Sequence, residues 1–204
     1  MLMKPMTQLL HATESTAIAQ AVQAIQQAEL VVFPTDTLYG VGVDAFNETA
    51  VAKLYAAKKR PFSKGIPILL ADLSDLEKVV TAVPDAAQHL IEQHWPGPLT
   101  IIVPKAAHLP ANISPNEGIA VRIPDHTAGR AFIRAAGGAL ATSSANLSGQ
   151  PPATTAAAAL DQLSSIAAVI LDDGPSPQQV ASTIISFLGP EPVIVRQGPV
   201  TINV

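Results

Sequence analysis

The sequence contains no cysteine, which excludes disulfide bonds, zinc–thiolate sites and cysteine nucleophiles together. Charged residues make up only 14% of the 204 residues, and the formal net charge is −4. Proteins that coat nucleic acid nonspecifically need a surplus of cations, so the composition disfavours that class but leaves a local basic pocket open. Aromatic residues, at 4%, are also too scarce for a typical RNA reader that stacks bases on aromatic rings.

Long apolar runs are missing as well. No stretch approaches the ~18 uninterrupted apolar residues of a membrane span. The first residues, MLMKPMTQLLHATE, lack the continuous apolar segment of a signal peptide. Hydrophobic residues nevertheless make up 48% of the chain, which is enough for a sizeable core. We therefore expect a soluble, cytoplasmic protein with no membrane partner.

Strand-like and helix-like segments alternate along the whole chain. ELVVFPT, GIPILLA, LTIIVP and GIAVRIP read as buried strands, and NETAVAKLYAAKK predicts a helix with Asn47 at its N-cap. In SDLEKVV, Ser74 and Glu77 have the spacing of a capping box. No internal repeat or long polar linker interrupts the pattern. It favours a single α/β domain, residues 1–204, with helices packed on a largely buried sheet.

Ligands of such sheets usually bind at the loops beyond strand ends. Polar side chains that follow predicted strands are therefore the candidates for a site. They are Thr35, Asp36, Thr37, Arg122, Ser143, Ser144, Asn146, Ser182, Thr183 and Arg196.

The basic residues are concentrated in one short window around YAAKKRPFSKG. Five of the 12 lysines and arginines lie there, namely Lys53, Lys58, Lys59, Arg60 and Lys64. Cations at a helix C-terminus offset the helix dipole, and Pro61 would simply end that helix. Alternatively, Lys58 and Arg60 flank one residue of an extended segment, from which both side chains could reach one phosphate chain. Spacing alone leaves both interpretations open.

Two polar stretches carry the same ambiguity. PTDTLYGVG, residues 34–42, contains glycines but lacks the third glycine of a dinucleotide fingerprint, so it is either a strand-ending turn or part of a site. ATSSANLSG, residues 141–149, could bind phosphate or carboxylate, or could be a polar helix entry.

Arg122 and Arg196, each in an apolar strand, need a carboxylate or phosphate partner, internal or bound. No spacing of histidine or aspartate predicts a protein-held metal.

Several motifs together resemble one known family. FPTDTLYGVG, KKRP, WPGPLTIIVP, AVRIPDH, TSSANLSGQPP, ASTIIS and VRQGP occur in the order and approximate spacing of the YrdC family, the threonylcarbamoyl-AMP synthases. The resemblance covers about residues 13–200. The family's K-x-R motif is matched by Lys58 and Arg60, and its S-x-N motif by Ser144 and Asn146.

The resemblance implies one YrdC-like α/β domain, in which helices surround a twisted mixed sheet with a concave electropositive pocket. It implies the conversion of L-threonine, bicarbonate (or CO₂) and ATP, accompanied by Mg²⁺, into threonylcarbamoyl-AMP and pyrophosphate. A separate tRNA-modifying threonylcarbamoyl transferase complex would then use the product to form N6-threonylcarbamoyladenosine at position 37. Such chemistry fits the absence of an obvious general base, because a carbamate is already anionic and needs mainly alignment and charge stabilisation.

By the same resemblance, Lys58 and Arg60 would be catalytic. The predicted ATP contacts are Lys58, Arg60, Ser144, Asn146 and Arg196. The predicted threonine contacts are Thr35, Arg122 and Ser182. No protein ligand to the metal is implied, because ATP oxygens would hold Mg²⁺.

The sequence departs from some relatives at Leu69, where they carry a histidine, so one polar substrate contact is missing or supplied elsewhere. The chain also looks like the short, single-domain form of the family. Two other functions remain open from the sequence. One is a non-catalytic RNA-binding protein of ribosomal or transfer RNA maturation, with a tRNA or double-stranded RNA contact. The other is a paralogue that acts on another carbamoyl or nucleotide ligand.

Overall fold

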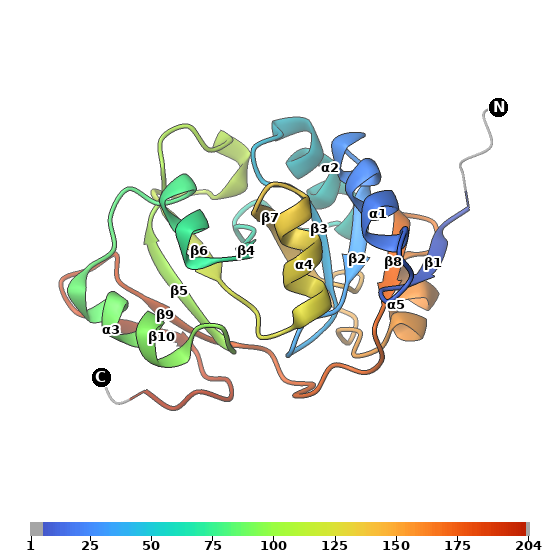
Figure 1. The fold of residues 1–204 in the computed structure, drawn as a ribbon. Helices are drawn as coiled ribbons and strands as arrows, with labels where there is room; N and C mark the ends of the chain where they lie inside the picture. Colours follow the sequence, from blue (N-terminus) through green and yellow to red (C-terminus); the bar gives the residue numbers. More distant parts are fainter. Residues whose placement is uncertain (1–5, 203–204) are drawn as a thin grey trace.

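The computed structural model of the protein describes residues 6–202, and the ends of the predicted domain, 1–5 and 203–204, lie outside the described residues. Within that part, ten strands form one mixed sheet with helices on both faces (Figure 1), which confirms the predicted α/β architecture. In sheet order the strands are β1 (Gln8–His11), β8 (Ala167–Asp172), β2 (Leu30–Phe33), β3 (Gly40–Asp44), β7 (Ala139–Ser144), β4 (Ile68–Leu70), β6 (Gly118–Arg122), β5 (Leu99–Pro104), β9 (Thr183–Ser186) and β10 (Val193–Arg196).

Five α-helices and two short 3₁₀ helices are described between these strands. They are α1 (Ala17–Gln26), α2 (Glu48–Lys58), η1 (Leu73–Lys78), α3 (Asp85–His94), η2 (Ala111–Ile113), α4 (Thr127–Ala135) and α5 (Ala156–Leu163). In residues 6–202, no helix has the length and apolar character needed to cross a membrane.

Capping agrees with the sequence at one helix and differs at another. Asn47 caps α2 as predicted, since its Oδ1 accepts a hydrogen bond from the Ala50 backbone N–H at 3.1 Å. The predicted capping box at Ser74 is wrong. The box is formed two residues earlier by Asp72 and Asp75, because each carboxylate accepts from the other's backbone N–H.

Alternating side chains on β2 build a core on each face of the sheet. Val31 and Phe33 point to the face that α1 and α4 cover, where Phe33 lies 5.2 Å from Phe132 of α4 between ring centroids. Leu30 and Val32 belong to the larger core on the other face, on which α2 and α5 pack. Figure 1 shows α1 and α4 side by side on the near face. This period of two is what a sheet buried on both faces requires.

The stretch predicted as a strand-ending turn is itself partly a strand. Residues 40–44 form β3, which pairs with β2 on one side and β7 on the other. A Cβ at Gly40 would lie 2.8 Å from the Thr142 methyl group, and one at Gly42 would lie 3.0 Å from the Phe33 ring. The two glycines therefore let these side chains pack directly on the backbone.

The face that α4 covers continues beyond α4 as the wall of a cavity. Leu140, packed in the core under α4, pairs across strands with Leu69, and Leu69 pairs with Arg122. Cross-strand partners point to the same face of a sheet, so Arg122 lies on the face that α4 covers further along. There, β6, β5 and β9 carry cavity-lining side chains instead of a helix.

Candidate active site

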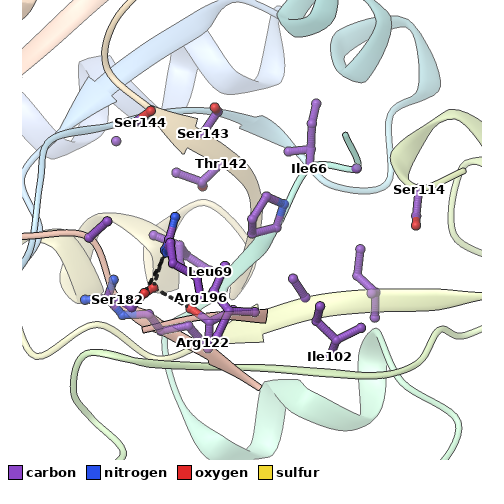
Figure 2. Close-up of a pocket in the computed structure, with 18 of the residues that line it drawn as sticks. Ile66, Leu69, Ile102, Ser114, Arg122, Thr142, Ser143, Ser144, Ser182 and Arg196 are labelled. Atoms are coloured by element: carbon purple, nitrogen blue, oxygen red, sulfur yellow. Dashed lines mark hydrogen bonds between the residues drawn. The ribbon is translucent and has the colours of Figure 1, made fainter. Parts of the chain in front are cut away.

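The cavity has a volume of about 410 Å³ and is open to solvent on one side. Among the residues described, its lining includes three arginines, Arg60, Arg122 and Arg196, and no aspartate or glutamate. Hydroxyl and amide side chains lie between the arginines: Thr35, Thr37, Ser63, Thr100, Ser114, Asn116, Thr142, Ser143, Ser144 and Ser182. Figure 2 shows Ser182 and Arg196 toward one end and Ser114 toward the other. This donor set suits an anionic ligand.

Arg122 is held rigidly at the base of the cavity. Its Nη2 donates to Asp36 Oδ1, its Nη1 donates to Thr37 Oγ1 at 2.8 Å, and its Nε donates to the Gly97 carbonyl at 2.9 Å. Burial lowers the pKa of Arg122, and the Asp36 carboxylate opposes that shift. The predicted partner of this strand arginine is thus an internal carboxylate, and two of its five N–H groups remain for a ligand.

Thr35 and Thr37 form a compact hydroxyl pair beside this arginine. Their Oγ1 atoms lie 3.1 Å apart, and Thr35 Oγ1 also donates to the Leu38 carbonyl at 2.6 Å. Both side chains are buried and line the cavity. The turn after β2 therefore delivers oriented hydroxyl groups next to Arg122.

Arg196, on the edge strand β10, is anchored to Ser182. Its Nε donates to the Ser182 carbonyl at 2.9 Å and its Nη2 donates to Ser182 Oγ at 3.1 Å. Ser182 Oγ in turn lies 2.8 Å from Thr100 Oγ1 of β5. Within residues 6–202, no carboxylate forms an ion pair with Arg196, so its charge is available to a ligand.

Arg60 reaches the cavity from a loop that it also organises. Its Nε donates to the Lys64 carbonyl at 2.8 Å and its Nη2 donates to the Gly65 carbonyl at 2.7 Å. Both acceptors are neutral, and no carboxylate of the described chain pairs with this guanidinium either. Burial lowers the pKa of Arg60, which reflects the cost of holding an unpaired charge partly away from water.

Lys58 lies behind the cavity wall. Its side chain is 2% exposed, and its Nζ donates to the backbone carbonyls of Ser144 and Asn146 and, at 3.3 Å, to Asn146 Oδ1. Burial, together with the nearby Arg60 charge, lowers the pKa of Lys58 to about 7. Three oxygen acceptors match the three donors of an ammonium group.

Six of the eight residues predicted from the sequence line the cavity together: Thr35, Arg60, Arg122, Ser144, Ser182 and Arg196. Lys58 and Asn146 do not line it, and they support Ser144 from behind, where Ser144 Oγ donates to Asn146 Oδ1 at 2.5 Å.

The predicted extended segment from Lys58 to Arg60 is wrong. Lys58 is the last residue of α2 and Lys59 follows with φ +52°, so the two cations leave the helix end in different directions.

Sequence reasoning missed polar residues at both ends of the cavity. Thr100, buried in β5, gave a signal only as the one polar residue of LTIIVP. Ser63, Ser114 and Asn116 lie on loops, where serine and asparagine are too common to single out. Leu69 lines the cavity and gives it an apolar wall at this position.

The side chains that line the cavity limit how a metal ion could bind there. In the described part of the chain, no group of three or more His, Asp or Glu side chains could hold a metal ion. Hydroxyl and amide oxygens alone bind divalent cations weakly, so Mg²⁺ in this cavity would need oxygens from the ligand.

Comparison with known proteins shows the family of this chain. The family model Sua5_yciO_yrdC, described as "Telomere recombination", matches residues 23–198. The chain belongs to the Sua5/YciO/YrdC family. A relative from Mycobacterium tuberculosis (strain CDC 1551 / Oshkosh) is 42% identical over 188 residues, which cover 92% of this chain and 86% of that one.

Other members of the Sua5/YciO/YrdC family are longer. A relative from Bacillus subtilis (strain 168), named threonylcarbamoyl-AMP synthase, is 40% identical over 194 residues, which cover 93% of this chain and 55% of that one. The crystal structure of Pyrococcus abyssi Sua5 complexed with L-threonine superposes with a TM-score of 0.89 at 33% identity. The match covers 94% of this chain and 57% of that chain, so this protein spans little more than half of those two relatives.

Proposed function

We propose that the protein is a threonylcarbamoyl-AMP synthase, an enzyme that joins L-threonine, bicarbonate or CO₂ and ATP into threonylcarbamoyl-AMP and pyrophosphate. The observation that carries this proposal is the cavity, in which Arg60, Arg122 and Arg196 converge with hydroxyl donors and without a carboxylate. The name of the Bacillus subtilis relative and the threonine complex of Pyrococcus abyssi Sua5 support the same reaction.

The chemistry needs little proton transfer at the nucleotide. The threonine amine adds to CO₂ and loses a proton, which gives a carbamate. A carbamate oxygen then attacks the α-phosphorus of ATP, the bond from that phosphorus to the bridging oxygen breaks, and pyrophosphate leaves. Charge builds up on phosphate oxygens, so fixed cations and hydroxyl donors are the groups that lower the barrier.

We assign the arginines of the cavity to the two substrates. Thr35, Arg122 and Ser182 would hold threonine, and Arg122 would use the N–H groups left free by Asp36, Thr37 and Gly97. Arg60 and Arg196 would meet the triphosphate beside the Ser144 hydroxyl. Lys58 and Asn146 would serve the nucleotide by fixing Ser144, and Mg²⁺ would enter on ATP oxygens.

The test is a pyrophosphate assay with purified protein, ATP, L-threonine and bicarbonate, with a matched reaction that omits threonine. Threonine-dependent pyrophosphate release is expected, together with a product whose mass equals threonylcarbamoyl-AMP. Equal release with and without threonine would exclude the synthase and favour a paralogue with another carbamoyl or nucleotide ligand.

The product would pass to a tRNA-modifying threonylcarbamoyl transferase complex. This transfer would take place in the cytoplasm, where ATP and tRNA are found.

Any contact with tRNA or double-stranded RNA would involve the loop that carries Arg60. Its exposed residues Lys59, Phe62 and Lys64 combine cations with an aromatic ring at the cavity rim. A salt-dependent gel shift that is lost in a Lys59→Ala/Lys64→Ala double variant would support this contact.

A further inference from the structure

Thr100 is a buried hydroxyl group with one specific partner. It is 4% exposed on β5, and within residues 6–202 its side chain hydrogen-bonds to Ser182 Oγ alone, at 2.8 Å. A valine would fill the same space without a polar atom to satisfy. The hydroxyl at this place therefore calls for an explanation beyond packing.

Ser182 Oγ is the shared atom of a three-residue chain. A hydroxyl has one hydrogen and two lone pairs. Arg196 Nη2 occupies one lone pair at 3.1 Å, and Thr100 can either occupy the second lone pair or accept the hydrogen. When Thr100 donates, both lone pairs of Ser182 are used, and Ser182 can only donate into the cavity.

We propose that Thr100 is a positioning residue of the reaction: through Ser182 it holds the Arg196 guanidinium and turns the Ser182 hydroxyl into a donor that accepts no bond from the ligand. This proposal rests on the proposed function and deepens it. With the cavity empty, either hydroxyl can donate across the Thr100–Ser182 contact. With an anionic oxygen present, Thr100 donates to Ser182 and Ser182 donates to that oxygen, so both hydroxyl hydrogens and both lone pairs of Ser182 Oγ have partners.

The strand that carries Arg196 explains why such an anchor is needed. In the sheet formed by residues 6–202, β10 is an edge strand that pairs only with β9, and its pairing shifts between Ile194 and Arg196. Ile194 pairs with Ile185, which lies in the core, whereas Arg196 pairs with Ile184, which lines the cavity. The bulge thus turns Arg196 to the cavity face.

A bulged edge strand has few backbone contacts that would keep the Arg196 side chain pointing into the cavity. Ser182 supplies two further contacts through its carbonyl and its hydroxyl. Thr100 belongs to β5, which pairs with β6 on one side and β9 on the other, so it ties Ser182 and Arg196 to an interior part of the sheet.

The ligand atom that this arrangement selects is a hydrogen-bond acceptor with negative charge. Either the threonine carboxylate or a phosphate oxygen of ATP has this chemistry, since Ser182 is assigned to the first and Arg196 to the second. A donor such as an ammonium or amide N–H finds no free lone pair on Ser182 Oγ.

The test compares Thr100→Val, which removes the hydroxyl at nearly constant shape, with Thr100→Ser, which keeps it. In steady-state assays, Thr100→Val should raise the KM for one anionic substrate by up to about tenfold, the upper end for one lost hydrogen bond between neutral groups. Thr100→Ser should stay within about twofold of the wild type. A rise in the KM for threonine alone identifies the carboxylate, and a rise in the KM for ATP alone identifies phosphate. Unchanged KM values in Thr100→Val would overturn the proposal.

Binding measurements separate this proposal from the proposed function. Calorimetry with L-threonine and with inorganic pyrophosphate needs no turnover, and Thr100→Val should weaken one of the two while Thr100→Ser restores it. Thr81→Val, at an exposed threonine outside the cavity, is the control and should bind both ligands normally. If the wild type releases no pyrophosphate yet Thr100→Val still weakens binding, the synthase assignment fails and the positioning role stands. Equal binding by Thr100→Val and the wild type overturns that role.

Discussion

Lys58 Nζ lies 2.8 Å from the backbone carbonyl oxygen of Asn146, and this contact ties the end of α2 to the turn that follows β7. The backbone strengthens the tie, because Ser148 N–H donates to the Lys58 carbonyl at 3.2 Å. The K-x-R and S-x-N stretches, more than 80 residues apart, therefore form one structural unit behind the cavity wall. Lys58 acts on the cavity through Ser144.

Replacing Lys58 should reveal this indirect action. Lys58→Met removes the three contacts while keeping the apolar stem, so we expect kcat/KM for ATP to fall about 30-fold, as for a group that positions a residue beside the triphosphate. Ser144→Ala should cost about tenfold, and the double variant should be little worse than Lys58→Met, because coupled residues do not add. A double-mutant cycle measures this, and a double variant equal to the product of the two losses would show independent roles.

The lowered pKa of Lys58 predicts proton uptake with ATP. At pH 7.5 a group with a pKa of about 7 is only partly protonated, and the charge of a triphosphate nearby favours its protonated form. ATP binding should therefore take up part of one proton in the wild type and less in Lys58→Met. Calorimetry in phosphate and in Tris buffer, whose ionisation enthalpies differ, measures the uptake; identical uptake in the two proteins would contradict it.

Arg60→Ala should lower kcat about 100-fold, because a guanidinium beside the phosphates is lost from the transition state. Arg60→Lys should recover only part of the rate, since lysine cannot span the Lys64 and Gly65 carbonyls and still reach the ligand. Lys53→Ala is the matched control, because Lys53 lies in α2 outside the cavity lining and forms a surface ion pair with Glu29. Single-turnover rates check the prediction, and a wild-type rate for Arg60→Ala would remove Arg60 from the site.

Much of this site could be predicted because strand ends and polar residues coincide. Thr35, Arg122 and Ser144 each follow or end an apolar run, and a sheet gathers such ends at one place. The positions of Lys58 and Asn146 could not be predicted this way. Whether a helix-terminal lysine points outward or back under the next turn depends on the left-handed backbone at Lys59, which no residue pattern signals.

The strands also divide into those that the sequence predicts and those that it does not. The apolar runs predicted β2, β4, β5 and β6, but β3 was missed because Gly40 and Gly42 suggest a turn. Only the packing of these glycines against Phe33 and Thr142 makes them strand residues. β1 was missed because its residues are mostly exposed, so no apolar run marks it. In both cases contacts distant in sequence override local propensity.

Asp36 should matter for stability as well as for the site. It neutralises the buried Arg122, so Asp36→Ala leaves an unpaired buried charge and should cost about 3 kcal/mol or more of unfolding free energy. Removing both charges in Asp36→Ala/Arg122→Met should cost less than Asp36→Ala alone. Glu29→Ala, at an exposed pair, should cost less than about 1 kcal/mol. Urea unfolding measures all three, and a double variant less stable than Asp36→Ala would contradict the explanation.

His126 should make stability fall in mild acid. Its Nδ1 accepts a hydrogen bond from the Gly129 backbone N–H at 3.3 Å and so caps α4, which requires an unprotonated Nδ1. Burial lowers the pKa of His126, although Asp173, Asp36 and Asp125 oppose this. Since the folded pKa lies below the unfolded value of about 6.5, the contribution is complete above that pH and is lost as pH falls through the folded pKa.

The corresponding experiment follows urea unfolding from pH 7.5 to 5 in matched histidine variants. His126→Asn keeps a capping side chain that does not titrate, so its unfolding free energy should depend less steeply on pH than that of the wild type. His89→Asn, at an exposed histidine of α3, should keep the wild-type slope and controls for the loss of a histidine as such. If His126→Asn and His89→Asn show the same slope, the cap of α4 does not depend on the protonation of His126, and the acid sensitivity must come from carboxylates such as Asp72, which is paired with Arg130 and Arg134 in the folded state.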